Sequence, residues 1–170
     1  MSIKKYPYCV YENAIPELIC DQIIKQGLVS KGEIGVTNAS NKDITKDPEK
    51  LKKLYAKRES CQFTIYNIGQ YYGWHKDSYV GADVIAKNHG RNRKLSVSLL
   101  LNDPEEYEGG DLEFIVENEK NPVNNKVEKI NKNKKGTLII FPSYVYHQVL
   151  PVTKGIRYSL VIWGQGKEWQ

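Results

Sequence analysis

Residues 137–163 read TLIIFPSYVYHQVLPVTKGIRYSLVIW and contain three runs rich in β-branched and aromatic residues. The runs cover residues 137–141, 144–150 and 156–163. Two turn signals separate them, Pro142-Ser143 and the segment 153–155, which ends in glycine. Short β-rich runs divided by turns are typical of a β-sandwich or a barrel.

The same pattern extends towards the N-terminus as far as about residue 60. Four further runs cover residues 62–66, 71–76, 94–101 and 111–116. Upstream of them, residues 15–27 carry apolar side chains at helical spacing, with Pro16 near the start and Gly27 past the end. A second short helix is predicted over residues 47–55, with Asp47 as its N-cap.

These patterns predict a mainly β protein with N-terminal helices. With 170 residues, the chain has the length of one domain. We expect a single domain over residues 1–170, in which residues 1–57 form a helical layer and residues 58–164 form a jelly-roll core. Residues 117–135 hold six lysines, six asparagines and three glutamates, and we expect a solvated loop there, with a lid facing the substrate as the alternative.

Charge and cysteine content exclude several classes of protein. Lysine and arginine total 25 and aspartate and glutamate total 20, so the net charge is only +5 and does not indicate a nucleic-acid-binding protein. No run approaches the roughly 18 apolar residues of a membrane-spanning helix, and we expect no signal peptide. The three cysteines form no disulfide framework, which favours a cytoplasmic protein. Richness in Lys, Asn, Ile and Tyr suggests an AT-rich genome, such as that of a small bacterium or a phage whose protein acts in the host cytoplasm.

The chain has three histidines, and two of them lie in a pattern that suggests a metal site. Asp77 follows His75 by two residues, so both side chains would point to the same face of a strand. His147 is located 70 positions after Asp77, in another β-rich run. Two histidines and one carboxylate form the facial triad that binds non-haem Fe(II). His89 lies in a polar loop without a partner at ligand spacing, and we interpret it as a surface residue.

An arginine and a serine follow the distal histidine. Arg157 comes ten residues after His147, across the predicted turn 151–155, and we expect this turn to fold the strand of Arg157 back beside that of His147. Ser159 would share a face with Arg157. A guanidinium beside a hydroxyl is suited to binding a carboxylate.

Together, residues 66–163 resemble the Fe(II)/2-oxoglutarate-dependent dioxygenases, in particular their prolyl 4-hydroxylase-like branch. The matching segments are YNIGQYYGWHKD (66–77), RKLSVSLLLND (93–103), EGGDLEF (108–114) and FPSYVYHQVLPVTKGIRYSLVIW (141–163). The resemblance implies a double-stranded β-helix, which is a jelly roll with the metal between its two sheets.

The resemblance also implies roles for individual residues. His75, Asp77 and His147 would be the Fe(II) ligands. Arg157 would bind the 5-carboxylate of 2-oxoglutarate with the help of Ser159, and Tyr66 would lie near this co-substrate. In some prolyl hydroxylases a tyrosine on the strand after the HxD segment also binds 2-oxoglutarate, and this chain has Leu100 near that place.

The implied activity couples oxidative decarboxylation of 2-oxoglutarate, to succinate and CO2, with hydroxylation of a substrate by O2. Ascorbate would act as the reductant, and Asp77 favours hydroxylation over halogenation. The first substrate class is a prolyl residue of a protein or peptide. The alternatives are a nucleic acid base or a small molecule, although the N-terminal half has no dense basic patch, and a non-enzymatic jelly-roll binding module. No membrane association is expected, and the oligomeric state is left open.

Overall fold

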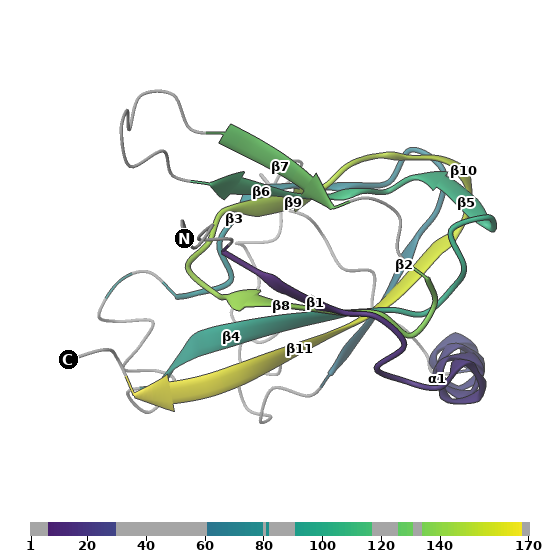
Figure 1. Cartoon of the computed structure of the whole chain (residues 1–170), viewed down its shortest axis with the longest axis horizontal. Coiled ribbons are helices and arrows are strands. Elements are labelled where there is room, and N and C mark those ends of the chain that lie inside the picture. The colour runs from purple at the N-terminus through teal and green to yellow at the C-terminus, as the bar shows by residue number, and fades with distance from the viewer. Residues whose placement is uncertain are drawn as a thin grey trace, which may run out of the picture.

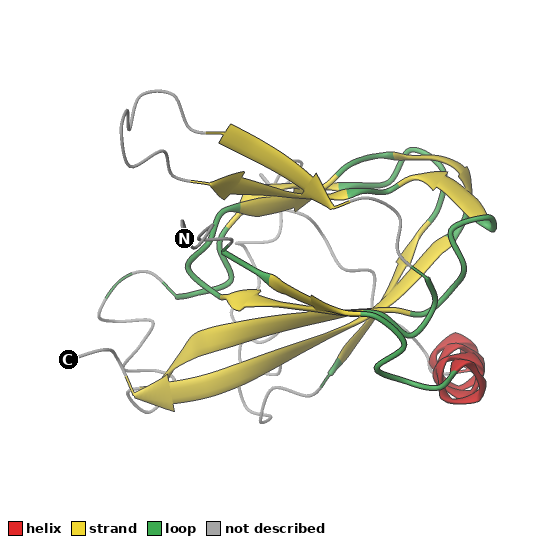
Figure 2. Ribbon diagram, viewed as in Figure 1, coloured by secondary structure: helices red, strands yellow, loops and turns green. Residues whose placement is uncertain are grey.

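The computed structural model describes residues 7–29, 61–79, 81, 91–116, 126–130 and 134–167. The predicted helix at residues 47–55 and His89 lie outside the described residues. Within the described ranges, one helix accompanies the strands, as Figure 2 shows. No helix in this part of the chain is long and apolar enough to cross a lipid bilayer.

Two antiparallel sheets face each other and are drawn one above the other in Figure 1. The five-stranded sheet has the order β1 (Cys9–Tyr11), β8 (Leu138–Pro142), β4 (Arg91–Leu100), β11 (Arg157–Lys167) and β2 (Gln62–Tyr66). The four-stranded sheet has the order β3 (Tyr72–His75), β9 (His147–Val149), β6 (Leu112–Val116) and β7 (Lys126–Ile130). A ribbon of β5 (Tyr107–Gly109) and β10 (Val152–Gly155) completes the set. This architecture confirms the predicted mainly β jelly roll.

The C-terminal end of strand β4 is buried on both faces, because the core lies on one side of it and the helix on the other. Leu100 belongs to the apolar cluster between the sheets, together with Phe114 and Phe141. Its neighbours Leu99 and Leu101 point the opposite way, into a second cluster. Alternation along a strand therefore explains why three consecutive leucines are all buried.

Helix α1 (Glu17–Val29) covers the outer face of the five-stranded sheet and confirms the predicted N-terminal helix. Cys20 of this helix is fully buried and packs into the apolar cluster between the helix and the sheet. Gly27 lies inside the helix rather than past its end, which corrects the predicted boundary. A Cβ at Gly27 would lie only 2.4 Å from Cδ1 of Phe63 on β2, so glycine here permits close helix–sheet contact and does not end the helix.

Four strands were not predicted, namely β1, β5, β7 and β10. The lysine-rich segment is not wholly a loop, because β7 pairs with β6 along its full length and buries Ile130. Most of the other β7 side chains are polar, so the segment lacks the run of β-branched and aromatic residues that would predict a strand. The predicted turn 151–155 largely forms β10, which pairs with β5.

The strand of Arg157 does not lie beside that of His147, so this expectation was wrong. Strand β9 pairs with β3 and β6, whereas β11 pairs with β2 and β4 in the opposite sheet. The intervening β10 pairs with β5 and carries the chain from one sheet to the other. Arg157 and His147 therefore approach the space between the sheets from opposite sides.

Candidate metal and co-substrate site

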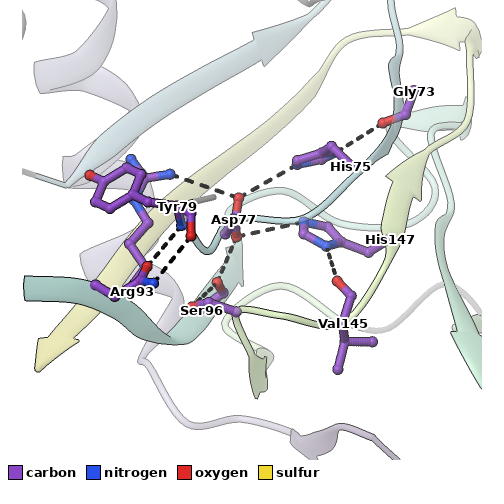
Figure 3. A network of polar contacts seen from close by, with 10 residues as sticks. Gly73, His75, Asp77, Tyr79, Arg93, Ser96, Val145 and His147 are labelled. Atoms are coloured by element: carbon purple, nitrogen blue, oxygen red, sulfur yellow. Dashed lines mark hydrogen bonds and ion pairs between the residues drawn. The ribbon is translucent and has the colours of Figure 1, made fainter. Parts of the chain in front are cut away.

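His75, Asp77 and His147 come together at one end of the four-stranded sheet. His75 on β3 and His147 on β9 are direct register partners, and their ring centroids are 4.1 Å apart. The Nε2 atoms of His75 and His147 lie 3.5 and 3.6 Å from the two carboxylate oxygens of Asp77. One ligand atom from each of the three residues lies within 4.8 Å of the others, so the group could hold one metal ion. Figure 3 shows Asp77 facing both imidazole rings.

Backbone carbonyls fix the orientation of both imidazole rings. Nδ1 of His75 is 2.8 Å from the carbonyl oxygen of Gly73, and Nδ1 of His147 is 3.0 Å from that of Val145. A ring that donates from Nδ1 to a carbonyl presents the lone pair of Nε2 on its other side. Both histidines therefore direct an acceptor nitrogen towards Asp77.

Asp77 lies beyond the end of β3, so strand alternation alone does not place it beside His75. Its backbone N–H donates to the carbonyl oxygen of Ser143 at 2.9 Å. The hydroxyl of Ser96 donates to its Oδ2 at 2.6 Å and lies 2.9 Å from the hydroxyl of Ser143. Two serines that the sequence did not single out thus hold the carboxylate in place.

The electrostatics of the site favour the protonation states that bind a metal. Burial raises the pKa of Asp77, but its contacts with His75, His147 and the Ser96 hydroxyl outweigh that effect and lower the pKa overall. Burial lowers the pKa of His147 to about 4, against the attraction of Asp77. Asp77 is therefore a carboxylate and His147 a neutral imidazole at neutral pH, which are the forms that coordinate metal ions.

Arg93 was also missed by the sequence analysis. Its Nη1 lies 4.0 Å from Oδ1 of Asp77, and its guanidinium stacks over the ring of Trp163 at 3.8 Å from the centroid. The ring centroid of Tyr79 lies 5.1 Å from the same guanidinium. A cation and an aromatic wall therefore border the metal-ligand cluster.

Arg157 and Ser159 lie on one face of β11, in the interior. Arg157 is 2% exposed, and its Nη1 donates to the hydroxyl of Ser159 at 3.0 Å. Tyr66 on β2 is the direct register partner of Arg157, and its ring centroid lies 5.4 Å from the guanidinium carbon. Thr64 continues the polar row, with its hydroxyl hydrogen-bonded to that of Ser159.

No described aspartate or glutamate forms an ion pair with Arg157, and its buried Nε has no hydrogen-bond partner among the described residues. A buried cation without a counter-charge is unfavourable unless a ligand supplies one. The bidentate geometry of a guanidinium matches a carboxylate. The residues present therefore fit a small ligand that carries a carboxylate.

Two further residues that the sequence did not single out position Arg157. A Cβ at Gly110 would lie 2.8 Å from Cδ of Arg157, so this glycine makes room for the arginine side chain. Asn102 donates from Nδ2 to the carbonyl oxygen of Ile156 and accepts a hydrogen bond from the N–H of Tyr158. The amide thus binds the backbone on both sides of Arg157, where β4 has already ended.

Residues 61–165, more than half of the chain, match the 2OG-Fe(II) oxygenase superfamily, and the chain belongs to this family. Its members are named for Fe(II) and 2-oxoglutarate. The match covers all six residues for which the sequence predicted a role: His75, Asp77, His147, Arg157, Ser159 and Tyr66.

Curated relatives include PKHD-type hydroxylases. One from Xylella fastidiosa is 36% identical over 107 residues, which cover 61% of this chain and 43% of that protein. One from Teredinibacter turnerae is 32% identical over 114 residues, covering 67% of this chain and 44% of that protein. The matched segment thus spans less than half the length of these relatives.

Solved structures share the fold at low sequence identity. A Pseudomonas putida prolyl-4-hydroxylase superposes with a TM-score of 0.63 at 17% identity, covering 97% of this chain and 95% of that one. A viral collagen prolyl hydroxylase from Paramecium Bursaria Chlorella virus-1 gives a TM-score of 0.56 at 22% identity, covering 95% and 97%. These likenesses establish the jelly-roll fold.

Proposed function

We propose that this chain is a 2-oxoglutarate-dependent hydroxylase in which His75, Asp77 and His147 hold Fe(II). Arg157 and Ser159 bind the 5-carboxylate of 2-oxoglutarate, and Tyr66 lies beside them. The observation that carries the proposal is the pairing of two features across the sheets. A His–Asp–His cluster on one side is matched by a buried arginine without a described counter-charge on the other.

Bound Fe(II), 2-oxoglutarate and O2 would supply the oxidation, in which one oxygen atom enters succinate and the other enters the hydroxylated substrate. The residues of the chain contribute binding and orientation. Asp77 remains ionised and balances part of the metal charge, and the two histidines bind through Nε2. Arg157 sets the direction from which the co-substrate reaches the metal. Ascorbate is proposed as the reductant.

We further propose a prolyl residue of a protein or peptide as the substrate. Two aromatic rings border the His–Asp–His cluster. The ring centroid of Tyr72 lies 3.9 Å from that of His75, and the ring of Trp163 stacks against the guanidinium of Arg93. Flat apolar walls suit a pyrrolidine ring, and Arg93 can donate to a peptide carbonyl. A Trichoplax adhaerens prolyl hydroxylase of this fold has been solved with a hypoxia inducible factor peptide fragment.

The proposal includes the organisation and the location of the protein. We propose that residues 1–170 form one domain that acts in the cytoplasm. The thiols of Cys9, Cys20 and Cys61 are all free, which supports a reducing compartment.

The test is succinate formation by the purified protein with Fe(II), ascorbate and 2-oxoglutarate under air, with and without a mixture of proline-rich peptides. We expect turnover that the peptides stimulate. Turnover that is indifferent to peptide would support the oxygenase and redirect the substrate to a nucleotide or a small molecule. No succinate, with iron demonstrably bound, would refute the enzyme and favour a binding module.

The His147→Ala variant tests the metal site in the same assay. We expect loss of both metal binding and turnover with the fold retained, because one of three ligands is gone. Circular dichroism checks the fold, and titration with Mn(II) checks the metal. Full activity in this variant would show that the assignment of the triad is wrong.

A further inference from the structure

Tyr107 is a buried tyrosine beside Arg157 for which the proposed function has no role. It opens β5 and is 4% exposed. Its hydroxyl forms a hydrogen bond with the guanidinium of Arg157. A Cβ at Gly110 would lie 2.8 Å from Cδ of Arg157 and 3.5 Å from Cε2 of Tyr107, so both side chains pack around this glycine.

The adjacent strand β4 offers no polar group at this level. Leu100 is the register partner of Ser159 on that side, and its side chain is buried and apolar. On the other side, Tyr66 of β2 faces the guanidinium of Arg157 with its ring. Arg157 forms hydrogen bonds with Ser159 on β11 and with Tyr107 on β5. Strand β5 is held close to this region because Tyr107 pairs with Gly155, two residues before Arg157.

The hydroxyl of Tyr107 keeps its proton and can donate. Burial raises the pKa of Tyr107, although the charge of Arg157 opposes this effect. A protonated phenol donates one hydrogen bond, and a carboxylate accepts from several donors at once. Beside a buried guanidinium, such a donor lowers the cost of placing a carboxylate away from water.

We propose that the hydroxyl of Tyr107 binds the distal carboxylate of 2-oxoglutarate together with Arg157 and Ser159. This inference rests on the proposed function and extends it by one co-substrate-binding residue. It also assigns a specificity, because Tyr107 would not increase the affinity for a 2-oxo acid that lacks the distal carboxylate. The contribution of Tyr107 should therefore be visible only with the dicarboxylic acid.

The test is the dissociation constant of 2-oxoglutarate for the full chain loaded with Mn(II), measured by isothermal titration calorimetry. We expect Tyr107→Phe to weaken this binding by roughly ten- to a hundredfold, the usual effect of losing a hydrogen bond to a charged group. The dissociation constants of Mn(II) and of 2-oxobutyrate, which has no distal carboxylate, should not change. Thermal unfolding should show that the variant remains folded.

Tyr158→Phe is the matched control. Tyr158 adjoins Arg157 on β11 but lies on the opposite face, where its ring stacks on Phe63 at a centroid distance of 5.9 Å. Removal of its hydroxyl should leave the binding of 2-oxoglutarate unchanged.

Two results would overturn the assignment of Tyr107. One is unchanged affinity for 2-oxoglutarate in Tyr107→Phe, and the other is an equal loss for 2-oxoglutarate and 2-oxobutyrate. The variant Arg157→Gln separates this failure from that of the proposed function. Loss of 2-oxoglutarate binding in Arg157→Gln alone would reject only the role of Tyr107, whereas retained binding in both variants would reject the co-substrate site itself.

Discussion

At the scale of single residues, the metal-ligand cluster depends on hydrogen bonds from outside it. Ser96 is fully buried on β4, in the sheet opposite the two histidines, and its hydroxyl donates to Oδ2 of Asp77. This bond fixes the rotation of the carboxylate, while the N–H of Asp77 holds its backbone on Ser143. Such outer contacts commonly tune metal affinity strongly.

We expect Ser96→Ala to weaken Mn(II) binding by about 10- to 100-fold, because Asp77 loses the donor that orients it. Isothermal titration calorimetry measures the effect. Ser98→Ala is the control, since Ser98 lies two residues further along the same face of β4 and is also buried. Equal metal affinities in the two variants would contradict a positioning role for Ser96.

The candidate metal-binding and carboxylate-binding residues could be predicted from the sequence, but the residues that hold them in position could not. The spacing of His75, Asp77 and His147, and the Arg157–Ser159 pair, stand out because few side chains bind metals or carboxylates. Ser96, Ser143 and Asn102 carry no such mark, since a serine or an asparagine is ordinary in any segment. Their roles follow from contacts between residues 19 to 56 positions apart, which depend on the completed fold.

At the scale of elements, the contact between α1 and β2 depends on one glycine. Gly27 lies inside the helix, where alanine would ordinarily be favoured by about 1 kcal/mol. Here a Cβ would lie 2.4 to 2.6 Å from three ring atoms of Phe63. The helix must either shift or force the aromatic ring from its place.

We expect Gly27→Ala to lower the free energy of unfolding by about 1 to 3 kcal/mol despite its better helix propensity. Urea denaturation followed by circular dichroism gives this value. Gln22→Ala, at an exposed position of the same helix, should change stability by less than about 0.5 kcal/mol. A stabilised Gly27→Ala variant would show that helix propensity outweighs the contact.

Elements with a strong apolar pattern could be predicted, whereas short or polar strands could not. Strand β2 agrees with its predicted bounds, because four of its five residues are β-branched or aromatic and a turn signal at residues 67–69 follows it. Strand β7 is largely polar, and β1 and β5 have only three residues each. Such strands form because they pair with strands that are distant in the sequence, and their own amino-acid composition does not reveal this pairing.

At the scale of the whole molecule, the proposed site joins the two sheets. The two histidines belong to the four-stranded sheet, whereas Arg157 belongs to the five-stranded sheet. Only the folded chain brings these groups together. A metal ion and a co-substrate that bind between them therefore bind the native state and not the unfolded chain.

We expect 2-oxoglutarate at about 100 times its dissociation constant to raise the melting temperature of the Mn(II)-loaded protein by roughly 5 to 10 °C. This range follows from a stabilisation of about 2.7 kcal/mol and the size of the chain. Differential scanning calorimetry measures the shift, and Arg157→Gln should remove it. A shift of equal size in that variant would locate the binding elsewhere.

The interior position of Arg157 has a consequence for how this chain can change. The fold keeps the guanidinium of Arg157 away from water without a described counter-charge, and replacing a buried charge by a hydrocarbon side chain of similar volume often stabilises a protein. Under the proposed function, stability and activity therefore make opposite demands on this position. Selection for heat resistance alone, with no co-substrate present, would favour replacement of this arginine. The resulting jelly roll would be more stable but would lack the proposed binding group for 2-oxoglutarate.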